Sequence, residues 1–254
     1  MSRQVVYLIG AGPGDPELLT LKGLRLLREA QAVVYDRLVS DEILAEIPPD
    51  AMRIYVGKQG GTHSLPQADI NKLLVDLAKQ YGTIVRLKGG DPYVFGRGAE
   101  EALDLVAAGI DFEVVPGITA ATGIMAGLGL PLTHRGVANG VRFVTAQCGK
   151  NVPLTLNWDS LADPDTTLVV YMGLAKLPEI SEKLIEAGMP ADQPAMAVSQ
   201  GTTDKEVVCR ASLSDLPEKV AMAALEPPVL IVIGRVADLA DSLGVNARYD
   251  RVED

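Results

Sequence analysis

Five short apolar runs, alternating with helical patterns, constrain the fold of this 254-residue chain most strongly. The clearest helical pattern extends from Ile70 to Tyr81, where apolar side chains recur at helical spacing. Such alternation predicts an α/β fold in which a mainly parallel five-stranded sheet is covered on both faces. The expected strands are Val5–Ile9, Ala32–Tyr35, Arg53–Val56, Thr83–Leu87 and Phe112–Val115.

The second half of the chain has a different strand pattern. Two of its apolar runs are separated only by a short segment containing Gly-Thr-Thr-Asp, which is too short for a parallel crossover and predicts an antiparallel hairpin. The second sheet is therefore expected to be mixed. Its expected strands are Val141–Thr145, Thr167–Met172, Ala195–Ser199, Glu206–Arg210 and Val229–Ile233.

A segment rich in Gly and Pro, residues 129–136, interrupts this periodicity and is interpreted as a linker. We expect an N-terminal α/β domain over residues 1–136, a C-terminal α/β domain over 137–245 and a polar tail over 246–254. Two α/β domains joined in this way commonly place their ligand in the cleft between them.

Charge and hydropathy exclude several classes of function. A net charge of -10 argues against nucleic-acid binding, which depends on Lys and Arg neutralising phosphates. No apolar run approaches the roughly 18 residues of a membrane span, and the first run continues into Gly-Pro-Gly-Asp, so it is interpreted as a strand and not a targeting segment. Cys148 and Cys209 lack metal-ligand spacing and are expected to be reduced thiols in the cytosol.

The segment Arg86–Glu101 is the first candidate for the wall of an active site. A predicted strand ends there in a Gly-Gly-Asp-Pro turn, and the chain enters a helix through Gly-Arg-Gly. Ligands of open α/β sheets bind at the carboxyl ends of strands, where this turn places Asp91 and Arg97.

The glycine cluster Gly10–Pro16 follows the first predicted strand and resembles a dinucleotide-binding turn, with Asp36 where a ribose-binding acid would stand. The third glycine of that pattern is missing, because Asp15 occupies its position. Pro13 and Pro16 also remove backbone donors that a pyrophosphate would use. A tight turn with Asp15 at a helix start explains the cluster equally well.

Other chemistries have little support in the sequence. No phosphate-binding loop of the G-x-x-x-x-G-K-[ST] type occurs, and His63 and His134 lie far apart without the neighbours of a metal site, so no metal is expected. Asp36 and Lys58 end neighbouring strand–helix units. They form either a solvated ion pair or, if a substrate lies there, part of a catalytic site.

The ordered set of turns resembles the uroporphyrinogen III C-methyltransferases of the tetrapyrrole methylase family over about 230 residues. The motifs that carry this resemblance are Gly10-Ala-Gly-Pro-Gly-Asp-Pro16, Leu18-Leu-Thr-Leu21, Tyr35-Asp36, Val56-Gly-Lys58, His63-Ser64, Arg86-Leu-Lys-Gly-Gly-Asp-Pro92, Val94-Phe-Gly-Arg-Gly98, Val115-Pro-Gly-Ile-Thr-Ala120, Pro131-Leu-Thr-His-Arg135 and Tyr171-Met-Gly173.

The resemblance implies a two-domain tetrapyrrole methylase fold, a cytoplasmic homodimer and the transfer of two methyl groups from S-adenosylmethionine to uroporphyrinogen III. The products would be precorrin-2 and S-adenosylhomocysteine. The pathway that precorrin-2 then feeds, whether sirohaem, cobalamin or haem d1, stays open. The residues that the resemblance places against the methyl donor are Pro13, Gly89, Gly90, Asp91, Val94, Thr119, Ala120, Met172 and Gly201.

The resemblance also implies roles for charged residues. Asp36 and Lys58 match positions assigned to proton transfer, and the residues expected to face the tetrapyrrole are Arg97, Glu100, Arg135 and Met172. Because the substrate carries eight carboxylates, arginines are expected to offset the negative charge of the protein. Arg97 is preferred as a clamp or electrostatic stabiliser, since a guanidinium is a poor base, whereas Asp36 is an ordinary one.

Some residues depart from the family pattern, and three other functions remain as alternatives. Ala99, Ala146-Gln-Cys148 and Arg235 differ from the residues expected at their positions. The alternatives are a related methylase acting on a later corrinoid precursor or on another acceptor, a nicotinamide-dependent oxidoreductase, and a non-catalytic tetrapyrrole-binding module. The missing third glycine argues against the oxidoreductase.

Overall fold

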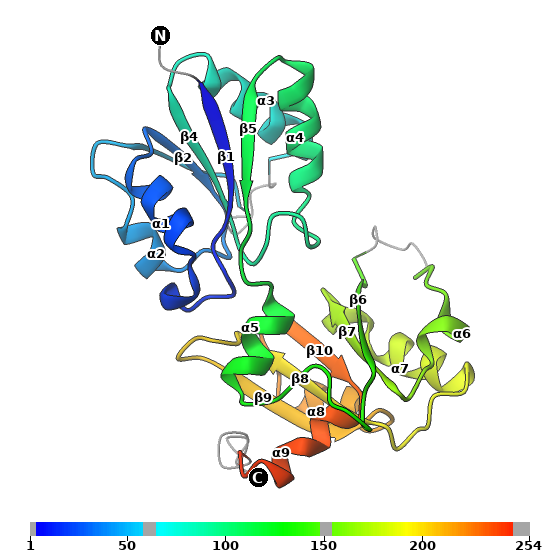
Figure 1. The fold of residues 1–254 in the computed structure, drawn as a ribbon. Coiled ribbons are helices and arrows are strands. Elements are labelled where there is room, and N and C mark those ends of the chain that lie inside the picture. Colours follow the sequence, from blue (N-terminus) through cyan, green and yellow to red (C-terminus); the bar gives the residue numbers. More distant parts are fainter. Residues whose placement is uncertain (1–3, 58–64, 148–153, 246–254) are drawn as a thin grey trace. The chain divides into compact units, whose positions relative to one another are not determined.

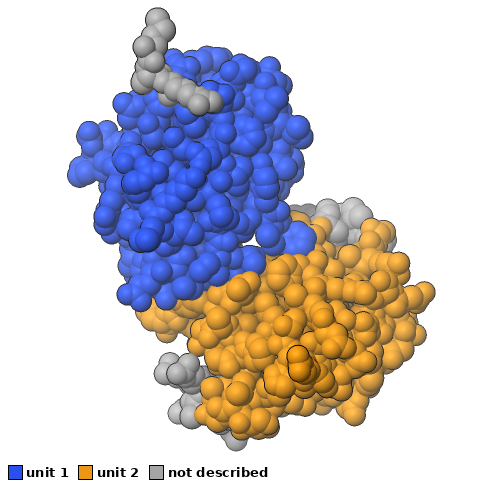
Figure 2. Space-filling view, in the orientation of Figure 1, with its two compact units in different colours: residues 1–120 blue, residues 121–254 orange. Residues whose placement is uncertain are grey.

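A computed structural model describes residues 4–57, 65–147 and 154–245 (Figure 1). The chain forms two compact units, residues 1–120 and 121–254, which Figure 2 shows in different colours. The sequence pattern places the domain boundary later, after residue 136, and that assignment stays a prediction. No helix of the described segments is both long and apolar enough to cross a membrane.

The sheet of the first unit is parallel throughout, which confirms the prediction for this half of the chain. Its strand order is β3-β2-β4-β1-β5, so β4 lies in the middle and β3 and β5 form the edges. The strands are β1 (Val5–Gly10), β2 (Ala32–Tyr35), β3 (Met52–Tyr55), β4 (Thr83–Lys88) and β5 (Asp111–Val115).

Helices cover both faces of this sheet (Figure 1). Alternate strand residues point to opposite faces, so Ile84 packs in one core with the third and fourth helices, while Val85 packs in another with the first and second. The first unit contains the short 3-10 helix η1 (Pro16–Leu18) and the α-helices α1 (Leu21–Arg28), α2 (Asp41–Ala45), α3 (Gln67–Ala78) and α4 (Gly98–Ala107).

The sheet of the second unit is mixed, with strand order β6-β7-β10-β8-β9. Only β6 and β7 are parallel among these neighbours, and β8 and β9 form the predicted antiparallel hairpin. The strands are β6 (Gly140–Thr145), β7 (Thr166–Tyr171), β8 (Pro194–Ser199), β9 (Val207–Ser212) and β10 (Val229–Ile233).

One face of the second sheet packs on α7 and α8 around the fully buried Ile231 and Ile233. Cys209 lies in this core as a free thiol whose pKa is raised by burial, while Cys148 lies outside the described residues. The helices of this unit, with α5 starting at the last residue of the first unit, are α5 (Ala120–Gly127), α6 (Trp158–Leu161), η2 (Leu174–Lys176), α7 (Leu177–Glu186), α8 (Leu216–Met222), η3 (Arg235–Asp238) and α9 (Leu239–Ser242).

Candidate active site

Three turns meet at the carboxyl edge of the first sheet. The turn after β1 pairs with the turn after β4, because the Gly12 amide donates to the Gly90 carbonyl at 3.1 Å and the Gly90 amide donates to the Gly12 carbonyl at 2.6 Å. A Cβ on Gly10 would lie 2.5 Å from the Cα of Gly117, in the turn after β5. Glycine therefore allows the main chains of these turns to approach closely. This edge holds the predicted donor residues Pro13, Gly89, Gly90, Asp91, Val94, Thr119 and Ala120.

The Asp91 carboxylate joins two of these turns. One oxygen, Oδ1, accepts from the amides of Tyr93 at 2.8 Å and Val94 at 3.2 Å, while Oδ2 accepts from the amide of Gly117 at 3.0 Å. The side chain thus fixes the turn after β4 and ties it to the turn after β5. The prediction that Asp91 faces the methyl donor stays a prediction, and these bonds show that its side chain also shapes the edge.

Asp36, at the end of β2, stands at the same edge. Its Oδ1 accepts from the amide of Leu38 at 3.0 Å, which closes the turn. A Cβ on Gly89 would lie 2.5 Å from the Cβ of Leu38, so the turns after β2 and β4 are in contact. Lys58, the other residue expected in proton transfer, lies outside the described residues, as does His63.

Arg97 precedes the first turn of α4 in a left-handed conformation, with φ of 60°. Its guanidinium forms a two-pronged ion pair with Glu100, at 2.8 Å from Nε and 2.7 Å from Nη2. The hydrogen bond to Glu100 raises the pKa of Arg97, and the same bond lowers the pKa of Glu100. Both side chains are at least half exposed, so the pair can exchange partners with an incoming carboxylate.

The second unit holds the other predicted residues. Met172 follows β7 with φ of 55° and an exposed side chain. The neighbouring Tyr171 hydroxyl accepts from the amide of Ala121, in the first turn of α5, at 3.0 Å. A Cβ on Gly201 would lie 2.5 Å from the side chain of Ile124, so this glycine lies close against α5.

Arg135 occupies an exposed turn of the second unit, between His134 and Ala138, which pair as an isolated β-bridge. The ring Nδ1 of His134 lies 2.9 Å from the Arg135 carbonyl, in keeping with its interpretation as a polar loop residue. Arg235 pairs with Asp165 and donates to the Val137 carbonyl at 2.7 Å, so it ties down the end of this turn.

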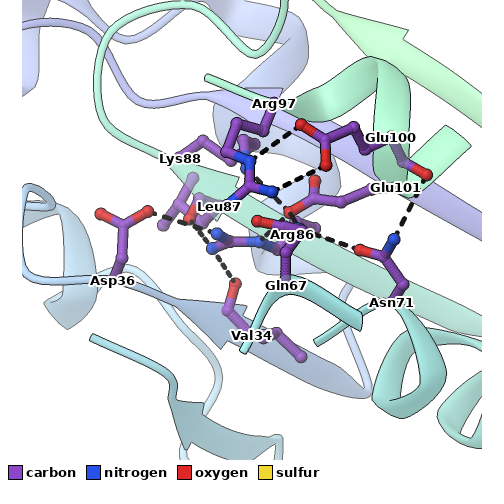
Figure 3. Close-up of polar contacts among 10 residues, drawn as sticks. All are labelled: Val34, Asp36, Gln67, Asn71, Arg86, Leu87, Lys88, Arg97, Glu100 and Glu101. Atoms are coloured by element: carbon purple, nitrogen blue, oxygen red, sulfur yellow. Dashed lines mark hydrogen bonds and ion pairs between the residues drawn. The ribbon is translucent and has the colours of Figure 1, made fainter. Parts of the chain in front are cut away.

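Sequence reasoning missed a buried group of charges beneath the edge of the first sheet. Arg86 and Lys88 on β4 converge on Glu101 of α4, and Arg86 also reaches Asp36 (Figure 3). The sequence held part of the signal, since residues two positions apart in a strand point to one face; the strand expected over Thr83–Leu87 includes Arg86 but ends one residue before Lys88. Their partner could not be identified there, because it comes from a different element.

Within the described segments, no group of three or more His, Cys, Asp or Glu side chains is placed to hold a metal ion. The polar groups that the structure places at the edge of the first sheet are backbone groups of the turns, the carboxylates of Asp36 and Asp91, and the exposed guanidinium of Arg97.

Comparison with known proteins identifies relatives over nearly the whole chain. The family model of the tetrapyrrole (corrin/porphyrin) methylases matches residues 5–217. A uroporphyrinogen-III C-methyltransferase of Paracoccus denitrificans is 52% identical over 98% of this chain and 86% of its own length. A siroheme synthase of Methylococcus capsulatus is 53% identical over 94% of this chain, but the chain spans only 50% of that longer protein.

A solved structure shares the fold. The uroporphyrin-III C-methyl transferase of Thermus thermophilus, complexed with S-adenyl homocysteine, superposes with a TM-score of 0.79 at 41% identity. The match covers 92% of this chain and 93% of that chain.

Proposed function

Because this chain belongs to the tetrapyrrole (corrin/porphyrin) methylases, we propose that it transfers two methyl groups from S-adenosylmethionine to carbons of uroporphyrinogen III. The products are precorrin-2 and S-adenosylhomocysteine. The observation that carries this proposal is the 52% identity, over 98% of the chain, to a protein named for that activity. The convergence of the glycine turns is compatible with it, since it brings three turns together at the carboxyl edge of the first sheet, where open α/β sheets commonly bind ligands.

The edge of the first sheet suits the methyl donor. S-adenosylmethionine carries no phosphate, so a backbone-lined edge stiffened by Pro13 and by the Asp91 bridge fits it better than a phosphate cradle would. When bound, it supplies an electrophilic methyl group: a new carbon–carbon bond forms on the pyrrole as the carbon–sulfur bond breaks and its electron pair stays on sulfur. The main task of the chain is to hold donor and acceptor in line. We assign donor contacts to Pro13, Gly89, Gly90, Asp91, Val94, Thr119, Ala120, Met172 and Gly201.

Charged side chains serve the acceptor. Arg97 donates two parallel hydrogen bonds, from Nε and Nη2, to the carboxylate of Glu100, and the same bidentate geometry also matches a substrate carboxylate. The raised pKa of Arg97 keeps its guanidinium charged. We therefore assign Arg97 as a substrate clamp, with Glu100, Arg135 and Met172 as further acceptor contacts. Asp36 is the base that receives the proton lost from the methylated ring, and Lys58 is assigned to the same proton transfer.

The decisive assay is incubation with labelled S-adenosylmethionine and uroporphyrinogen III, followed by mass spectrometry. We expect mass gains of one and then two methyl groups. Tetrapyrrole binding without transfer would indicate a non-catalytic module, and preference for a later corrinoid would indicate a related methylase. Calorimetry showing tight NAD binding without S-adenosylhomocysteine binding would indicate an oxidoreductase.

Replacing Arg97 by lysine tests the clamp. Lysine keeps the positive charge but cannot donate two parallel hydrogen bonds to a carboxylate. Arg97→Lys is therefore expected to lower the rate of methyl transfer by roughly 10-fold or more while leaving S-adenosylhomocysteine affinity nearly unchanged. The matched control is Arg25→Lys, which alters an equally exposed arginine–glutamate pair on α1, with Glu29 at 3.2 Å. Wild-type turnover in Arg97→Lys would remove Arg97 from the site.

We also propose that the chain acts as a cytoplasmic homodimer, as its resemblance to the family implies. Light scattering coupled to size-exclusion chromatography tests the assembly, with a mass of twice 26.9 kDa as the expected result. A monomeric mass for the active enzyme would contradict it.

A further inference from the structure

The middle strand of the first sheet carries two cations into the protein interior. Arg86 and Lys88 stand two residues apart on β4 and therefore point to the same face. That face is the one covered by α3 and α4, since Ile84, two residues earlier, packs in their core. Each side chain is about 95% buried, so both cations require negative partners from the protein.

A single buried carboxylate serves both cations. Glu101 on α4 is fully buried, and its Oε1 lies 3.0 Å from Nε of Arg86 and 2.8 Å from Nζ of Lys88. The same oxygen accepts from the Gln67 amide at 3.2 Å, while Oε2 has no hydrogen-bond partner among the described residues. Burial, and next the charge of Arg86, lower the pKa of Lys88. Two cations thus share one anion in a poorly hydrated place.

Asp36 supplies the missing negative charge. Its Oδ2 lies 3.4 Å from Nη2 of Arg86, on the side of the guanidinium away from Glu101 (Figure 3). The guanidinium is also anchored by a 2.9 Å bond from Nη1 to the carbonyl of Leu87. Since the other oxygen of Asp36 accepts from the amide of Leu38, Arg86 holds the one carboxylate oxygen that the turn itself leaves unfixed.

We propose that Arg86, anchored by Glu101, is a positioning residue that sets the orientation of the Asp36 carboxylate for proton removal during methyl transfer. The inference rests on the proposed function, in which Asp36 is the base. Arg86 is too deeply buried to touch either donor or acceptor, so it acts through Asp36. A fixed carboxylate meets the departing proton without first reorienting, which affects kcat and not the affinity for the methyl donor.

The matched pair of variants is Arg86→Met and Lys88→Met. Each removes one of the two cations on the same face of β4 and leaves the other paired with Glu101. The fully buried carboxylate therefore keeps a cationic partner in both variants, and both are expected to fold. Of these two cations, only Arg86 bonds to Asp36 in the described structure. We expect Arg86→Met to lower kcat by about 10-fold or more and Lys88→Met to change it by less than about 3-fold.

The affinity for S-adenosylhomocysteine, measured by calorimetry, is expected to stay within about 2-fold of wild type in both variants. Equal losses of kcat in the two variants would overturn the proposal, because they would indicate a general effect of the buried charges. Arg86→Lys keeps a cation but loses the bidentate donor geometry of the guanidinium, so its kcat is expected to lie between that of Arg86→Met and that of wild type.

A double-mutant cycle with Asp36→Asn tests whether Arg86 acts through Asp36. Single turnovers with labelled S-adenosylmethionine are compared in wild type, both single variants and the double variant. If Arg86 works through Asp36, Arg86→Met changes the rate by less than about 2-fold once Asp36 is Asn. The same loss in both backgrounds overturns the proposal.

Failure of this inference is distinguishable from failure of the proposed function. Absence of methyl transfer in the wild type would overturn the function itself. Wild-type kcat in Asp36→Asn would overturn the assignment of the base and, with it, this inference, while leaving the methyl transfer standing.

Discussion

The middle strands of the two sheets differ sharply, although each stands third in a five-stranded order. β10, over Val229–Ile233, is apolar and buried at every position. β4 is just as enclosed from Ile84 onward, yet it carries Arg86 and Lys88. The middle strand of the second sheet thus contributes only apolar side chains to its core, whereas the middle strand of the first sheet carries a buried charge network.

The difference shows where the protein accepts a cost in stability. A buried ion network is commonly no more stable than apolar residues of similar volume, so the charges on β4 do not explain the stability of the first unit. They do connect the interior to Asp36 at the sheet edge, where the site is proposed. β10 has no charged side chain with which to make such a connection, because its sequence is Val-Leu-Ile-Val-Ile.

The largest effect on this comparison is expected from Glu101→Leu. Removing the shared carboxylate leaves Arg86 and Lys88 buried together, which is expected to lower the free energy of unfolding by about 3–5 kcal/mol. Urea denaturation of the full chain measures it. The control Glu100→Gln removes an exposed ion pair next in sequence and should cost about 1 kcal/mol or less. A Glu101→Leu protein as stable as the control would show that the cations reach water.

A smaller effect on stability is expected from shortening one buried side chain of the apolar strand β10. Ile231→Val removes one buried methylene from β10 and leaves no polar group without a partner, so it should cost about 0.5–1.5 kcal/mol in the free energy of unfolding. The same urea series measures this change. A loss as large as that of Glu101→Leu would erase the contrast between the two strands.

The subtlest effect concerns pH. Because the pKa of Lys88 is lowered from 10.5 in the folded protein, the unfolded chain binds this proton between the lowered value and 10.5 while the folded chain does not. Stability contributed by Lys88 therefore rises with pH across that window, by at most about 1.4 kcal/mol per pH unit. The free energy of unfolding is measured against pH for wild type and for Lys88→Met. Taking the difference between the two curves removes the contributions of titrating groups that both proteins share. A difference that stays constant with pH would contradict the lowered pKa.

Most of the fold was predictable because its signals are local. The apolar runs identified the ten strands of the described segments, and the short connection between β8 and β9 predicted their antiparallel pairing. The glycine turns were equally visible, because each motif is contiguous in sequence. The domain boundary predicted after residue 136 stays a prediction; the compact units divide between residues 120 and 121, at the start of α5.

The candidate site was only partly predictable. Asp91 and Arg97 were identified from a contiguous motif, but the bond from Asp91 to the Gly117 amide joins residues far apart in sequence. The pairing of Arg97 with Glu100, by contrast, follows from a spacing of three residues at the start of a helix. Local spacing is readable in one sequence, whereas contacts between different elements depend on how those elements pack.

By itself, the sequence determined the alternation of strands and helices, the glycine turns at the strand ends and the family to which they belong. Only the tertiary structure decided that Arg86, Glu101 and Asp36 form one network. The physical reason is that a buried charge must find its partner in three dimensions, and here β2, β4 and α4 each supply one member.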